Sequence, residues 1–399
     1  MKWLSYSLYK ISLLLVALTS MFAWMFWYLS VPVIIISFVA TTFMLITHPN
    51  DFVNKKTLLI PLFILLIFEI YFIRDNEIQS FFSAILRTFI VGSVIFLTNA
   101  RKNEIIHFLT KSIGLILLIS MFFWFLFLMG VNLPSTITIF QKGRYVYENY
   151  YFFLFDLKLQ VFFLPRFSSI FPEPGYLALI TTFLIVANKF NFRNFWGFVL
   201  LIATLISFSL AGYVLLFLSS AIYYIGLSKH PVRNFIVLGI LAVGFVVFFM
   251  NYNDGNNPVK ILIFDRLRVE DGDIAGNNRT TFLFKDYFEH FIHKPEVIWG
   301  IGSKKYATMT WGGGTAGIKV FVVMHGVIGL LLMIAFYLSY FFQYQSKVGI
   351  NMVITYFVCY LQNTYPLAEI TLIIFITGLA YLQSVQSAEQ AKQQIAYGT

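Results

Sequence analysis

Long apolar runs separated by short polar segments extend along most of this chain of 399 residues. The runs are about 17–25 residues long, the length that an α-helix needs to cross the hydrocarbon core of a bilayer. A barrel in the membrane would instead show short segments of alternating hydrophobicity. The pattern therefore predicts an all-α, polytopic helical membrane protein with about twelve transmembrane helices.

The apolar runs and the turn signals between them place the predicted helices. The first run is too long for the apolar core of a signal peptide, so we interpret it as the first transmembrane helix. Two longer segments, 132–174 and 251–318, are predicted to be loops of a single domain that covers residues 1–399. The predicted helices are 11–29, 31–47, 57–73, 80–98, 105–131, 175–188, 195–209, 212–227, 233–250, 319–342, 351–365 and 367–384.

The composition supports a membrane protein. Hydrophobic residues make up 59% of the chain and charged residues only 12%, against roughly 25% charged residues in soluble domains. The net charge of +10 is explained first by the lysine and arginine excess of cytoplasmic loops, so no nucleic-acid partner is expected. The single cysteine, Cys359, excludes an internal disulfide and a zinc site built on several thiolates.

The distribution of lysine and arginine predicts the orientation in the membrane. With both termini in the cytoplasm, the cytoplasmic segments hold thirteen lysines and arginines, whereas the short outer loops hold only Arg74. This asymmetry is typical of the positive-inside rule. The two long loops then face the outside of the cell membrane, where ATP is not available, and the sequence contains no phosphate-binding GxxxxGK[ST] loop.

The motif RFSSIFPEPGYLAL, 166–179, places charged residues at the entrance of an apolar run. Pro174 is suited to the first turn of a helix, and Glu173 would then lie at the positive end of the helix dipole. Glu173 is either an interfacial charge at a helix start or an acceptor for a proton or a sugar hydroxyl. Because the dipole favours the charged form, a catalytic base at this position needs burial.

Further candidates lie in the second long loop. Arg266, Arg268, Arg279 and Lys285 could hold a phosphate group, since a guanidinium fork binds phosphate through two hydrogen bonds. The alternative is a solvated loop, because acidic and basic residues are nearly balanced there. The stretch VEDGDIAG, 269–276, is interpreted as a turn rather than a metal site, since expected oxygen ligands are missing.

Aromatic and glycine-rich stretches leave two interpretations open. The aromatic residues of GRYVYENYYFF, 143–153, could stack on sugar rings or form an interfacial belt. The glycines of 300–306 and 310–319 fit a mobile lid as well as a connector.

Four ionisable residues within or near the predicted helices are considered as candidates for a role or a partner. His325 is either a base or a packed polar residue. Arg87 lies deep enough in its predicted helix to need a partner, and Glu69 on the preceding helix is the predicted one. Glu69 and Glu369 are either functional groups within the membrane or residues near the outer interface.

Three motifs in order resemble those of the O-antigen polymerases of the Wzy type. RFSSIFPEPGYLA resembles their arginine–glutamate–proline signature, and SFSLAGYVLL, 207–216, resembles the motif that follows it. NNRTTFLFKDYF, IWGIGSKKY and KVFVVMHGVIGLLL, within 277–332, resemble the region that leads from the large loop into the next helix. The resemblance covers about 160–335, less than half of the chain.

The resemblance implies a fold similar to the GT-C glycosyltransferases and a place in the bacterial inner membrane. Such proteins polymerise oligosaccharide units linked to undecaprenyl pyrophosphate at the periplasmic face, without a metal, a cofactor or a nucleotide sugar. Besides the lipid-linked substrate, membrane lipids are expected partners, and a chain-length regulator is a further candidate.

The resemblance also implies roles for individual residues. Arg166 and Arg279 would stabilise the pyrophosphate, with Arg266, Arg268, Lys285 and Tyr176 as further substrate contacts. Glu173 is the first candidate for the base that activates the acceptor hydroxyl, and His325 is the second.

Two alternatives remain open at this point. O-antigen ligases share the superfamily but carry a His-Asn pair before the glycine pair of the last region, where this chain has Gly314 and Thr315. This difference favours a polymerase. A transporter or flippase for a lipid-linked glycan should be built from repeats with polar groups at mid-membrane, whereas the polar groups here gather toward one face.

Substitution of Arg279 by lysine tests the predicted pyrophosphate contact. The positive charge stays but the planar fork is lost, so we expect long glycan chains to disappear while the protein still inserts into the membrane. The measurement is the glycan length distribution on a gel. Unchanged long chains in Arg279→Lys would exclude a two-point contact from this residue.

Overall fold

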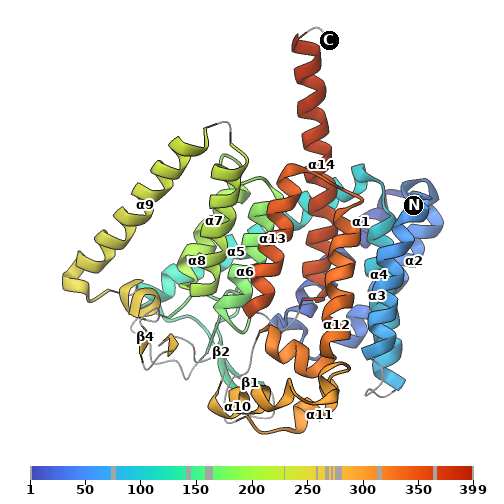
Figure 1. Ribbon diagram of the computed structural model, residues 1–399. Helices are drawn as coiled ribbons and strands as arrows, with labels where there is room; N and C mark the ends of the chain where they lie inside the picture. Colours follow the sequence, from blue (N-terminus) through green and yellow to red (C-terminus); the bar gives the residue numbers. More distant parts are fainter. Residues whose placement is uncertain are drawn as a thin grey trace. The chain divides into compact units, whose positions relative to one another are not determined.

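A computed structural model describes most of the chain as helices. Within the described residues it contains fourteen α-helices and two small antiparallel sheets (Figure 1). The predicted all-α class is thus confirmed at the level of a mainly helical protein. The described residues are 2–72, 78–140, 145–157, 165–228, 230–257, 259–265, 269–270, 273–274, 281–311, 317–362 and 366–397.

The helices belong to two compact units. Unit 1 comprises Met1–Ser20, Tyr28–Ile106 and Asn278–Thr399, and unit 2 comprises Met21–Trp27 and His107–Asn277. The boundary between Ile106 and His107 falls within helix α5, Asn99–Leu128, so residues 99–106 belong to unit 1 and residues 107–128 to unit 2.

Unit 1 contains helices from both ends of the chain. Helix α1 packs against α2 and α14, and α3 packs against α4 and α12. The first half of α14 is the most buried part of this unit, with Ile370, Ile373, Phe375 and Ile376 fully buried. The helices are α1 Lys2–Ser20, α2 Ser30–Thr47, α3 Leu59–Phe72, α4 Ile78–Phe96, α10 Phe282–Phe291, α11 Ser303–Thr308, α12 Ile318–Phe341, α13 Lys347–Gln362 and α14 Glu369–Tyr397.

Unit 2 is organised around α6, in which nearly every residue is buried. Helices α7 and α8 pack against α6, and a Cβ at Gly212 would lie 2.4 Å from the Cβ of Ala178, so only glycine permits this approach. Helix α9 is the opposite case, because none of its residues is buried. The helices are α6 Pro174–Ala187, α7 Phe195–Ile206, α8 Leu210–Ala221 and α9 Pro231–Asn251.

In the part of the chain that the structure describes, six helices are long and apolar enough to cross a membrane: 3–20, 30–47, 99–128, 231–254, 318–341 and 369–394. The other apolar helices are shorter, at 10–17 residues. Each of the twelve predicted helices corresponds to a helix of the structure.

The predicted bounds of the first and last helices were wrong. The first helix begins at Lys2 and ends at Ser20, not at 11–29, and the last continues to Tyr397. Polar residues near the N-terminus interrupt the apolar pattern, so the start of the first helix was predicted too late. In the structure, Ser5 and Ser12 of this helix are buried.

A three-stranded antiparallel sheet was missed within the predicted loop 132–174. Strand β1, Thr136–Phe140, pairs with β2, Tyr145–Asn149, which pairs in turn with β3, Phe155–Leu157. The alternation in TITIF is a period-2 signal that could have identified β1.

A second pair of strands lies within the stretch 269–276, which was interpreted above as a turn. Strands β4, Val269–Glu270, and β5, Asp273–Ile274, pair antiparallel. Residues 271–272 lie outside the described residues.

Helix α12 is interrupted where a loop backbone crosses it. Gly326 has φ +68°, and Gly300 of the crossing segment has φ +74°. The amide of Ile301 donates to the carbonyl of Val323 (2.8 Å), and the amide of Ile328 donates to the carbonyl of Ile298 (3.2 Å). The glycines of 300–306 therefore serve a close contact between two backbones, which fixes the segment after α10 on α12.

Substitution of Gly326 by alanine tests this crossing. A Cβ there would lie 2.3 Å from the carbonyl oxygen of Ile298, and the left-handed backbone disfavours alanine, so we expect a loss of about 3 kcal/mol of stability. Thermal unfolding in detergent measures it. The matched control is Gly239→Ala in α9, where no atom lies within 4 Å and stability should stay equal or rise slightly. Equal midpoints for Gly326→Ala and wild type would contradict a crossing that needs glycine.

Candidate functional site

The segment that precedes α6 is held firmly in unit 2. Phe167, Ile170 and Phe171 are fully buried. The hydroxyl of Ser168 donates to the carbonyl of Phe155 (2.7 Å), which links the segment to β3. Residues 165–173 are therefore a fixed, non-helical approach to the helix.

Arg166 lies where the first two sequence motifs meet. Its Nε donates to the carbonyl oxygen of Ser207, 3.4 Å away, at the C-terminus of α7. Tyr213 is close enough for the guanidinium to interact with its hydroxyl electrostatically, and that hydroxyl donates to the carbonyl of Leu205. The negative end of the α7 dipole favours the cation at this point. The half-buried guanidinium is thus oriented by groups of the second motif.

The predicted helix start at Pro174 is confirmed. Glu173 is the N-cap residue of α6, in extended backbone conformation, and Pro174 occupies the first turn. The carboxylate caps no amide of the helix and is exposed to solvent. Tyr176 is half-buried in the same first turn, and its amide donates to the carbonyl of Glu173 (3.1 Å). A substrate would have to supply the burial that a base at Glu173 requires.

The aromatic residues before this segment are partly structural. Tyr147 is buried and stacks on Phe155 with ring centroids 4.5 Å apart, and Trp27 packs edge-on against Phe155 at 5.4 Å. Tyr147 therefore contributes to the core of unit 2 rather than to a sugar platform or an interfacial belt.

The remaining predicted site residues belong to unit 1 or are not described. Arg266, Arg268 and Arg279 lie outside the described residues. Lys285 lies half-buried on α10.

His325 is buried on α12 at the break next to Gly326. Its ring centroid is 4.6 Å from that of Phe321 and 5.4 Å from that of Phe68. This packing matches the interpretation of a packed polar residue, and a catalytic role for His325 stays a prediction.

The predicted partner of Arg87 was wrong. Its Nε lies 3.2 Å from Oε1 of Glu369, at the start of α14. Glu69 interacts electrostatically with both residues but is not the ion-pair partner. The error arose because sequence order suggested neighbouring helices, whereas α14 packs against α4 from the far end of the chain.

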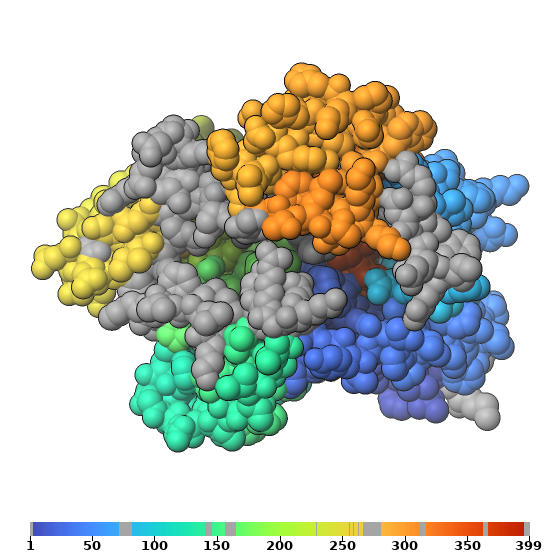
Figure 2. Space-filling view, turned by 90° about the horizontal axis from the view of Figure 1, so that it is seen from below, coloured from blue at the N-terminus to red at the C-terminus, as the bar shows by residue number. Residues whose placement is uncertain are grey.

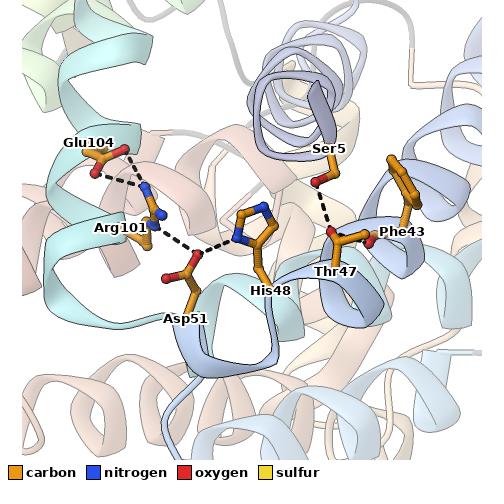
Figure 3. Close-up of polar contacts among 7 residues, drawn as sticks. All are labelled: Ser5, Phe43, Thr47, His48, Asp51, Arg101 and Glu104. Carbon is orange, nitrogen blue, oxygen red and sulfur yellow. Dashed lines mark hydrogen bonds and ion pairs between the residues drawn. The ribbon is translucent and has the colours of Figure 1, made fainter. Parts of the chain in front are cut away.

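A second charged cluster links the N-terminal helices of unit 1 (Figure 3). Nε of Arg101 lies 3.0 Å from Oδ2 of Asp51, and the Arg101 guanidinium also contacts the carboxylate of Glu104 and covers the ring of Tyr6. His48 approaches the same Asp51 oxygen at 3.2 Å. This cluster joins helix ends and has the character of a structural network.

Sequence reasoning missed the burial of Lys102, which it counted as a loop charge. The side chain is fully buried. Its Nζ donates to the carbonyl of Ile95 (2.7 Å) and to the hydroxyl of Tyr344 (2.5 Å). No local signal separates it from the exposed lysines, because one of its acceptors, the Tyr344 hydroxyl, lies 242 residues away in the sequence.

Comparison with known proteins does not assign the chain to a family. No protein-family model matches the chain, and no curated protein shows significant similarity to it.

The Arg87–Glu369 pair should contribute to the stability of unit 1. Glu369→Gln leaves the guanidinium without its counter-charge, and we expect a loss of about 2 kcal/mol, reduced from the value for fully buried pairs because Arg87 is partly exposed. Thermal unfolding of the single variants and of Arg87→Met/Glu369→Gln measures the coupling.

Glu104→Gln is the control for that cycle. This side chain is 47% exposed in its pair with Arg101, and we expect a loss below about 0.5 kcal/mol. Strictly additive effects of the Arg87 and Glu369 substitutions would mean that the pair contributes nothing.

Proposed function

We propose that this chain is a polysaccharide repeat-unit polymerase, a metal-independent membrane glycosyltransferase. It moves a growing glycan from polyprenyl pyrophosphate onto an incoming lipid-linked repeat unit. The observation that carries the proposal is the contact of Arg166 with Ser207, next to Tyr213. Two motifs that resemble the polymerase signature meet at this contact, and Glu173 follows Arg166 at the start of α6.

The proposed reaction assigns each residue a step. The acceptor hydroxyl attacks the anomeric carbon of the growing chain, and the bond from that carbon to the pyrophosphate oxygen breaks. The hydroxyl proton passes to Glu173, and polyprenyl pyrophosphate leaves with the bonding electron pair. Arg166 stabilises the negative charge that develops on the leaving group. The same role for Arg279 rests on the sequence resemblance alone.

The membrane setting forms part of the proposal. We infer about twelve transmembrane helices in a GT-C-like arrangement within a bacterial inner membrane, with both termini in the cytoplasm. The long loops then face the periplasm, where a lipid-linked glycan carries its own leaving group and no nucleotide is needed.

Reconstitution tests the function directly. Purified protein is mixed with a lipid-linked repeat unit from its own host, without ATP or added metal, and the products are separated on a gel. A ladder of increasing glycan length supports a polymerase. Transfer of a finished glycan in a single step indicates a ligase, and substrate movement across vesicles without a ladder indicates a flippase.

Substitution of Glu173 by glutamine tests the proposed base. Glutamine keeps the size of the side chain but cannot take the proton, and general-base loss reduces rates by about 100-fold to 10,000-fold. We therefore expect no ladder from Glu173→Gln under conditions in which wild type forms one.

The control is Glu148→Gln in the sheet of unit 2, where the carboxylate accepts a bond from Ser135 (2.7 Å). This variant should form the wild-type ladder. Wild-type chain lengths in Glu173→Gln would exclude Glu173 as the base and leave it as a charged residue at the start of a helix.

A further inference from the structure

Helix α10 presents two different faces within unit 1. Phe284 and Phe291 are fully buried and form a cluster with Val320 and Val323 of α12. The neighbouring face, at positions three and four apart, is open. It lines a pocket of about 430 Å³ formed by Leu283, Asp286, Tyr287, His290, Thr310 and Trp311. The segment 281–311 is visible in orange on the face shown in Figure 2.

The aromatic wall of this pocket is fixed before any ligand arrives. The Trp311 ring packs edge-on against Tyr287 (5.0 Å between centroids) and Phe284 (5.2 Å), and stacks on Tyr306 (5.3 Å). The hydroxyl of Thr281 donates to the carbonyl of Trp311 (2.6 Å) and also caps α10. A wall held from several sides loses little conformational freedom when a ligand binds.

The rim of the pocket offers hydrogen bonds. The side chains of Asp286 and His290 are 60% and 72% exposed, and Nδ1 of His290 lies 2.8 Å from the carbonyl oxygen of Asp286. Burial and the carboxylate of Glu296 raise the pKa of Tyr287. Its phenol therefore stays a neutral donor throughout the physiological pH range.

The charges of the pocket disfavour a phosphate ligand. No lysine or arginine is among the six lining residues, and the carboxylate of Asp286 repels anions. Apolar rings beside carboxylate, imidazole and hydroxyl groups instead suit a ligand with an apolar face and many hydroxyl groups. The volume lies within the range of roughly 300–1,000 Å³ for small-molecule sites.

We propose that this pocket of unit 1 is a glycan-binding subsite that takes sugar residues rather than the pyrophosphate group. The identity of the glycan, the repeat unit of the host polysaccharide, rests on the proposed polymerase function. The pocket itself rests on the geometry of α10 and Trp311. A shallow, open site suits one part of a longer chain, because the rest of the glycan can continue beyond its rim.

The test measures binding of a soluble glycan without any transfer reaction. The probe is the oligosaccharide released by mild acid from the host's lipid-linked repeat unit. The full chain is held in nanodiscs, because maltoside detergents would present competing sugars. Calorimetry should detect binding to wild type. Asp286→Asn should weaken it about tenfold, as expected for the loss of a hydrogen bond to a charged group.

Two further variants keep the test decisive. Glu289→Gln changes an exposed acid on the same helix outside the pocket and should bind like wild type. Tyr287→Phe keeps the ring packed but removes the donor, and should weaken binding about fivefold.

Equal binding by Asp286→Asn, Tyr287→Phe and wild type would overturn the subsite, as would the absence of binding to wild type. Because no transfer occurs, a failed polymerase assay with intact, Asp286-dependent binding would remove the proposed function and leave a glycan-binding site. A normal ladder with no binding at this pocket would support the proposed function and exclude the glycan-binding subsite.

Discussion

Polar groups in a lipid-exposed protein must find partners within the protein, and this constraint shapes both units. No water in the hydrocarbon region can satisfy them. In unit 1, buried tyrosines meet this need. The hydroxyl of Tyr356 donates to the carbonyl of Thr371 (3.0 Å), and that of Tyr340 donates to the carbonyl of Ile376 (3.2 Å). These bonds tie α12 and α13 to α14, so the same contacts that remove a cost also fix the packing of the helices.

In unit 2, smaller side chains satisfy buried polar groups in the same way. The hydroxyl of Thr204 donates to that of Thr181 (2.7 Å) between α7 and α6. At the end of α7, Arg166 donates a hydrogen bond to the carbonyl of Ser207. The last carbonyls of a helix have no amide partner within it, so this bond satisfies one of them. A residue that completes a helix terminus is held in position, and a held guanidinium is a suitable binding group for a leaving anion.

Local signals were sufficient for some features of the fold and the candidate site. Apolar length identified the helices, and Pro174 identified the start of α6, because both signals act within a few residues. Contacts between distant parts of the chain were not accessible. The pairing of Arg87 with Glu369 and the burial of Lys102 depend on helices that meet only after folding. The crossing of Gly300 and Gly326 is similar, since glycine in a sequence does not reveal which backbone it approaches. The pocket beside Trp311 requires the cap of α10, a cluster of rings and a helix break to occur together.

Helix α9 differs from the other long helices in its exposure. None of its 21 residues is buried, although the helix is apolar enough to cross a membrane. In a membrane, lipid rather than buried protein contacts would therefore surround most of this helix. Its length of about 31 Å, at 1.5 Å per residue, is close to the hydrocarbon thickness of a typical bilayer. The tilt of this helix should follow the thickness of the surrounding membrane, so the lipid composition of the host becomes one of the determinants of its conformation.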